Sequence, residues 1–165
     1  MGDFVGTVGS PGSKIPIELS GKIVMRATYP LTEHEAFLFT AALNGIVIQM
    51  KKECFEISDL RQVFVLCTED GKFTFADKEG MGYYLPLIIL NLGNWRTGNW
   101  SDVHIIATLV EEFCHHFWSI DDEEIVKHKV LEILNRILNF EVTFDSLYGP
   151  RWKEAYPTIY GDDIK

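Results

Sequence analysis

The chain has 165 residues, of which 47% are hydrophobic and 24% charged, values typical of one globular domain with a substantial core. Its net charge of −9, without an extended cluster of lysines and arginines, argues against unaided binding to nucleic acid. No apolar run reaches the length of about 18 residues that a membrane span needs, and no secretory signal opens the chain. We therefore expect a cytoplasmic protein with no membrane partner.

The N-terminal part predicts a leader followed by a strand. Residues 1–14 are rich in glycine and have few apolar side chains, so we expect a flexible leader there and a single domain over residues 15–165. Residues 22–29 (KIVMRATY) predict a strand, which Pro30 would end.

A helix is predicted next. Thr32 and Glu35 have the spacing of a capping box, and residues 36–43 form a good helical run. Asn44-Gly45 interrupts that run. The β-branched residues 46–48 after the break are compatible with either a strand or a continued helix.

The middle of the chain predicts β structure. Residues 62–76 combine an apolar run, an Glu-Asp-Gly turn at 69–71 and an alternating segment, which is the pattern of a β-hairpin. Residues 86–92 (PLIILNL) predict a short buried strand. The segment 93–100, rich in Gly, Asn and Trp, is expected to be a loop.

Two consecutive helices are predicted in the second half. The first covers about residues 102–118 with Ser101 as its cap, and the second covers about 122–138 with Ser119 or Asp121 as its cap. The order of elements indicates an α+β domain, with a small, mostly antiparallel sheet and the helices packed on one face.

The run TLVEEFCHHFW at residues 108–118 carries the side chains best suited to bind a metal or to catalyse a reaction. It differs from the H-E-x-x-H pattern of zinc enzymes in one place, because Glu111 stands where the first histidine would be. Glu111 and His115 are four residues apart, so both side chains reach one metal ion from the polar face of a helix. The alternative is a solvated helix face with an i, i+4 ion pair.

The next helix offers a third ligand. Glu123 falls on the apolar stripe of that helix, and an inward carboxylate needs a partner, so we prefer Glu123 to Asp121 as a ligand. The alternative is that the dipole of its own helix stabilises Glu123.

Cys114 faces the apolar side and is expected in the core, and the odd set of three cysteines is typical of free thiols. We favour core or interface roles for the tryptophans over a shared cleft.

With these elements in this order, the segment 32–138 resembles the minimal zincins, a family of compact metallopeptidase domains. The resemblance rests on the hairpin 62–76, the strand 86–92, the helix with TLVEEFCHHFW and the acidic start of the next helix, SIDDEE. It implies that Glu112 is the general base and that Glu111, His115 and Glu123 hold zinc or another divalent metal. It also implies that the strand 86–92 binds a peptide or protein.

The glutamate in place of the first histidine leaves two functions open. One is a metal-dependent peptidase or other hydrolase with an atypical Glu/His/Glu site, whose oxygen-rich ligands favour harder cations than zinc. The other is a catalytically inactive zincin-like module that acts as a protein-binding or structural protein. Metal content is the property that separates them.

Overall fold

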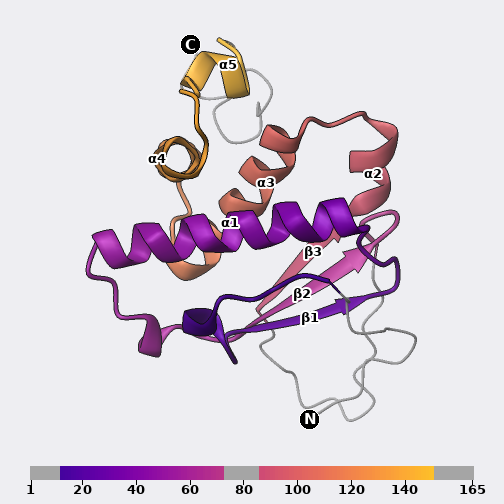
Figure 1. Cartoon of the computed structure of the whole chain (residues 1–165), viewed down its shortest axis with the longest axis horizontal. Coiled ribbons are helices and arrows are strands. Elements are labelled where there is room, and N and C mark those ends of the chain that lie inside the picture. The colour runs from indigo at the N-terminus through magenta and orange to yellow at the C-terminus, as the bar shows by residue number, and fades with distance from the viewer. Residues whose placement is uncertain (1–11, 73–85, 151–165) are drawn as a thin grey trace.

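The computed structural model describes residues 12–72 and 86–150, and its three strands form one parallel sheet (Figure 1). The strands follow one another in the order β1-β2-β3, with the bounds Ile23–Ala27, Val63–Thr68 and Leu87–Asn91. In the register, Met25 lies opposite Val65, and Val65 lies opposite Ile88, with both pairings parallel. The expectation of a mostly antiparallel sheet is therefore wrong.

The direction of β2 follows from the helix that precedes it. The chain leaves β1, returns along α1 (Glu33–Lys52) and starts β2 at the same end as β1, the crossover that parallel neighbours require. Five of the six residues of β2 are buried, which is typical of a central parallel strand.

The predicted hairpin is not formed by the described part of β2. The turn at its end exists, since Gly71 has φ +71° and its N–H donates to Thr68 Oγ1 over 2.9 Å. However, β2 has β1 on one side and β3 on the other, both parallel. The expected return strand falls mainly on residues 73–76, outside the described residues.

Helix α1 begins as predicted and continues further. Thr32 and Glu35 form the capping box, with each side chain bonded to the backbone N–H of the other. The helix then runs through Gly45, because this glycine is buried where α4 packs on α1. A Cβ at position 45 would come within 2.9 Å of Ile133 Cγ2 and 3.0 Å of Ile137 Cγ2. The glycine thus permits a close helix contact and does not end the helix.

The C-terminal half supplies the remaining helices. Their bounds are Leu92–Thr97 for α2, Asp102–Phe117 for α3, Glu123–Ile137 for α4 and Phe144–Tyr148 for α5. Short 3-10 turns, η1 and η2, cover Ile17–Leu19 and Ile57–Asp59. Ser101 caps α3 as predicted, whereas the cap of α4 is Asp122 and not Ser119 or Asp121. Helix α2 stands where a loop was expected.

The helices and the sheet share one core. Figure 1 shows α1 lying along the sheet, with α3 and α4 on the same side. Helix α1 packs against both α3 and α4, and the edge-to-face contact of Phe39 with Phe113 joins α1 to α3 at 5.9 Å between ring centroids. One continuous cluster contains buried residues of all three strands and of these three helices.

The expected leader and the search for a membrane span involve residues of which only some are described. Of the expected leader, residues 1–11 lie outside the described residues, and Lys14 N–H donates to Thr40 Oγ1 over 3.0 Å. Within the described ranges, no helix is both long and apolar enough to cross a bilayer.

Candidate functional site

Three side chains from two consecutive helices converge at the junction of α3 and α4. Glu111 and His115 lie one turn apart on α3, and Glu123 is the first residue of α4. One potential ligand atom from each of the three lies within 4.8 Å of the other two. The structure thus brings together the three residues that the sequence nominated as metal ligands.

The connection between the helices sets the orientation of His115. Ser119 has φ +52° in this short connection, and the ring nitrogen Nδ1 of His115 lies 2.5 Å from the carbonyl oxygen of Ile120. A carbonyl oxygen only accepts, so Nδ1 carries the proton and donates. The other nitrogen, Nε2, is directed to Glu123 and lies 3.7 Å from its Oε1. Nε2 is therefore the atom of His115 that can accept a proton or bind a cation.

A fourth residue, Lys127, occupies the centre of this group. Its side chain is completely buried, and Nζ donates to Glu111 Oε1 and to Glu123 Oε2, each over 2.9 Å. The ammonium also lies 5.2 Å from the centre of the Tyr148 ring. Hereafter the polar cluster means Glu111, His115, Glu123 and Lys127. It already contains a cation between its two carboxylates.

Sequence reasoning missed Lys127, although a signal for it exists. Lys127 follows Glu123 by four residues, so the two lie on the same side of α4. By helical geometry this side is also the apolar stripe, with Val130 and Leu134. A lysine on an apolar stripe, one turn after an inward glutamate, indicates a buried ion pair.

Glu112, the expected general base, lies at the rim of the polar cluster. Its side chain is exposed to solvent and forms no hydrogen bond within the part of the chain described. Desolvation by the surrounding protein raises its pKa, His115 opposes this effect, and the negative charges of Glu111 and Glu123 add to it. The raised pKa makes the Glu112 carboxylate a stronger proton acceptor, but it does not show what the proton donor would be.

The fit of a divalent metal to this group is incomplete. Zinc binds oxygen and nitrogen ligands at about 2.0–2.2 Å, so two ligand atoms of one ion lie no more than about 4.4 Å apart. One ligand atom from each of the three residues lies within 4.8 Å of the other two, but Glu111 and Glu123 each have one oxygen bonded to Lys127. A metal would therefore share these carboxylates with the Lys127 ammonium, with the remaining carboxylate oxygens as its ligands.

The other histidines on α3 do not join the polar cluster. His104 Nδ1 lies 2.7 Å from the hydroxyl of Ser101, the cap of the helix. His116 packs beside Phe117, and burial lowers its pKa.

Cys114 is buried as predicted, and Cys67 is buried as well. Burial raises the pKa of both thiols, that of Cys67 to about 12, so neither thiol is a ready nucleophile.

The tryptophans do not form one shared cleft in the described parts of the chain. Trp95 is buried in the core, and Trp118 packs against Phe55 and donates to Glu53 Oε2 over 2.7 Å. Trp100 is 37% exposed. Trp152 lies outside the described residues. The expectation of core roles holds for Trp95 and in part for Trp118.

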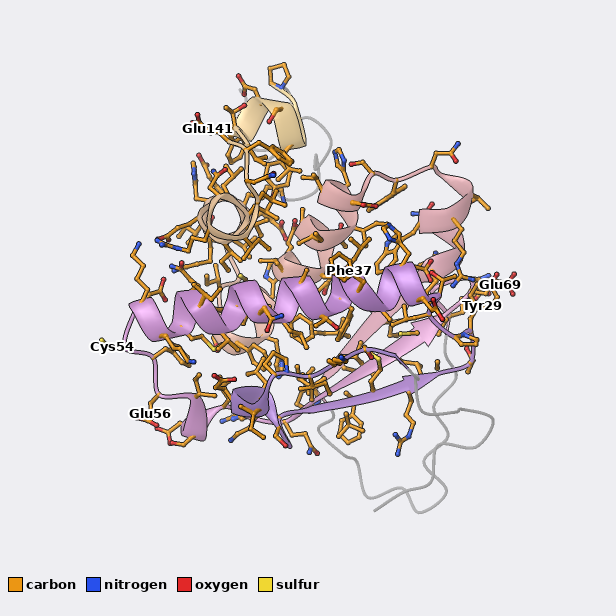
Figure 2. All side chains as sticks on the ribbon, viewed as in Figure 1. Tyr29, Phe37, Cys54, Glu56, Glu69 and Glu141 are labelled. Atoms are coloured by element: carbon orange, nitrogen blue, oxygen red, sulfur yellow. The ribbon has the colours of Figure 1, made fainter. Side chains whose placement is uncertain are left out.

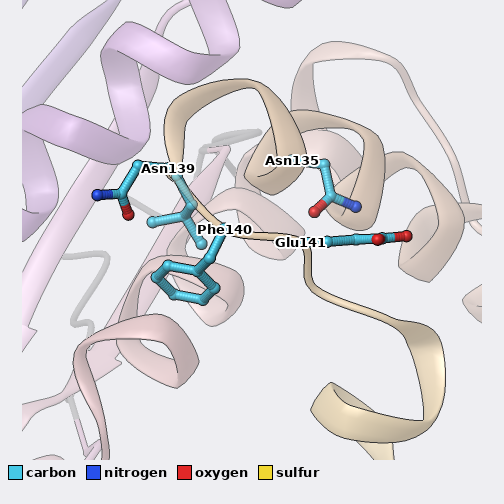
Figure 3. A pocket seen from close by; sticks show the side chains of 5 residues that line it. Asn135, Asn139, Phe140 and Glu141 are labelled. Carbon is cyan, nitrogen blue, oxygen red and sulfur yellow. The ribbon is translucent and has the colours of Figure 1, made fainter.

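Two surface depressions lie apart from the polar cluster. The first, of about 430 Å³, is lined by Asn135, Leu138, Asn139, Phe140 and Glu141 at the end of α4 (Figure 3). The second, of about 340 Å³, is lined by Gly98, Asn99, Trp100, Ser101 and His104 between α2 and α3. Neither depression includes a residue of the polar cluster in its wall.

No protein-family model, curated protein or solved structure matches this chain. The zincin resemblance therefore stays a prediction, since a convergent Glu/His/Glu group is not by itself a mark of that family. It also stays a prediction that Glu111, His115 and Glu123 bind a metal and that Glu112 acts as a base.

Proposed function

We propose that this chain is a non-catalytic protein-binding module, and that its polar cluster is a structural ion-pair centre. The supporting observation is Lys127, whose completely buried ammonium donates to both Glu111 and Glu123. These are the two carboxylates that a metal would need, so the positive charge that they require comes from the protein itself.

Electrostatics supports this choice. A divalent ion bound by the same carboxylates would sit within a few ångströms of the Lys127 ammonium, and like charges about 4 Å apart repel by several kcal/mol at an effective dielectric constant of about 20. Lys127 has no exposed surface, and Tyr148 lies over its ammonium group, so it cannot move into water without opening the contact between α4 and α5. The protein is expected to keep its own cation.

Neither of the two surface depressions described above includes the expected base, Glu112, in its wall. A peptidase holds its substrate against the base that activates water, which here would be Glu112. The two depressions at the end of α4 and between α2 and α3 are lined by other residues. Binding to a partner needs no such cleft, because flat surfaces with exposed apolar side chains suffice.

A metal-dependent hydrolase is the second candidate, and the convergence of the three potential ligands favours it. In that role Glu111, His115 and Glu123 would hold zinc or a harder divalent cation, which would polarise a bound water. Glu112, with its raised pKa, would take a proton from that water. The net charge also allows it, because two carboxylates and one ammonium leave one negative charge in the polar cluster.

Metal content decides between the two candidates. The purified full chain is dialysed against Zn²⁺ or Mn²⁺ and then against metal-free buffer, and bound metal is measured by mass spectrometry. The proposal expects well under one equivalent, and a Tm that a chelator does not change. About one equivalent, lost in Glu111→Ala and His115→Ala and kept in the matched control His104→Ala on the same helix, would establish the metal site instead.

A further inference from the structure

Helix α1 carries an exposed apolar face on the side away from the core. Phe37 is 66% exposed and Ile48 is 48% exposed. Between them on the same side of the helix lie the exposed Asn44 and the half-buried Ala41, which also packs against the core. In Figure 1 no described helix or strand lies in front of this part of α1, and Figure 2 labels Phe37 there. We call the residues Phe37, Ala41, Asn44 and Ile48 the α1 face.

The α1 face is symmetric about the middle of the helix. Phe37 and Ile48 are equally distant from the midpoint between residues 42 and 43, and so are Ala41 and Asn44. Two charged residues on the same side continue the pattern, because Glu33 in the first turn and Lys52 in the last turn are also equally distant from that midpoint. The apolar residues thus lie between an acidic end and a basic end.

We propose that the α1 face is the contact surface for a second copy of this chain, with the two α1 helices packed antiparallel about a twofold axis. In this arrangement Phe37 of each copy meets Ile48 of the other copy, and Ala41 meets Asn44 near the axis. The small Ala41 side chain lets the helices approach to the usual 8–10 Å, a distance of about one helix diameter.

The charges at the two ends complement each other in the same arrangement. Glu33 of one copy lies beside Lys52 of the other. Lys52 already bonds to Glu132 over 2.8 Å, but half of its side chain remains exposed, so it can serve a second carboxylate. His34 would meet Lys51, and Asp102, which is 2.8 Å from His34, brings a carboxylate to that place.

Self-association explains the pattern better than a different partner. A twofold contact uses the same patch on both copies, so each residue must complement the one at the mirrored position. The α1 face meets this condition because Phe37 lies against Ile48 and Glu33 lies against Lys52, while the small Ala41 lies against Asn44 near the axis. A helix of 20 residues is about 30 Å long, and one such helix pair lies at the lower limit of specific interface size. We therefore expect a weak dimer that depends on concentration.

Sedimentation equilibrium of the full chain tests the dimer. From about 10 μM to about 1 mM, the average mass is expected to rise from 18.9 kDa towards twice that value. Ile48→Glu places two charges in the contact and should weaken association at least about tenfold. The matched control is Ile125→Glu, because Ile125 is an equally apolar residue on α4 with 58% exposure. Circular dichroism checks that both variants fold.

A charge-exchange experiment tests the twofold geometry itself. Glu33→Lys puts lysine against lysine at both ends of the contact, and Lys52→Glu puts glutamate against glutamate. Each variant alone should be monomeric at about 1 mM, whereas an equimolar mixture should dimerise, because both end pairs are then opposite in charge. A chain that stays monomeric at all concentrations, or a dimer unaffected by Ile48→Glu, would overturn the inference. It is independent of the metal question, since none of these residues belongs to the polar cluster.

Discussion

The polar cluster between α3 and α4 and the α1 face differ in whether their side chains find partners within the chain. In the polar cluster, half-buried carboxylates pair with the fully buried ammonium of Lys127, which belongs to the same chain. On the α1 face, Phe37 and Ile48 are exposed to water. The polar cluster, whose sequence suggested a metal site, therefore finds its partners within the chain. The α1 face, whose sequence suggested only a helix, leaves apolar side chains exposed.

Replacement of Lys127 by methionine should lower the stability most, because it removes the only ammonium group of the polar cluster. Two carboxylates would lose the same buried cation, and breaking a buried ion pair from one side costs about 3–5 kcal/mol. Urea unfolding at pH 7 and low protein concentration measures the loss. The control is Lys51→Met, whose exposed ion pair with Glu18 should contribute much less to stability. Equal losses in both variants would contradict the central role of Lys127.

A second prediction separates the inner side of α1 from its outer side. Gly45→Ala adds a methyl group that would come within 3.0 Å of two isoleucines of α4, so we expect a loss of about 1–3 kcal/mol. This is contrary to helix propensity, which favours Ala over Gly by about 1 kcal/mol. Asn44→Ala, one residue earlier and exposed, should change stability by less than about 0.7 kcal/mol. If Gly45→Ala stabilised the chain in thermal unfolding, α1 and α4 would be less closely packed than described.

The sequence predicted local features well because short-range interactions determine them. The capping box of Thr32 and Glu35 and the cap at Ser101 depend on residues within one turn of each other, and both are found. The direction of β2 depends instead on the crossover through α1. The alternating residues 72–75 suggested a hairpin, whereas the continuous burial of β2 was the more informative signal.

The candidate site shows the same limit. The spacing of Glu111, His115 and Glu123 correctly predicted that these side chains face one another. It did not predict their actual partner, because Lys127 was not considered among the inward residues of α4. A pattern of ligand types states which groups can meet a cation, and only the packing of α3 against α4 shows that the Lys127 ammonium lies between the two carboxylates.

Glu112 gives the smallest expected effect and tests where the polar cluster ends. A carboxyl whose pKa is raised in the folded state favours folding in its protonated form, so its contribution is full below about pH 4 and disappears as the pH rises through the folded-state pKa. At pH 7 the ionised carboxylate is therefore unfavourable. Glu112→Gln should be slightly more stable than the unaltered chain at pH 7, by less than about 1 kcal/mol because the side chain is exposed, and equally stable near pH 4.

Thermal unfolding at the two pH values measures this difference, with Glu141→Gln as an exposed control outside the polar cluster. The result bears on function as well as on stability. If Glu112→Gln were less stable at pH 7, the ionised carboxylate would be stabilised in the folded state by a further positive charge close to it. A bound divalent ion is the natural source of such a charge, so this outcome would favour the hydrolase, and a gain in stability favours the ion-pair centre.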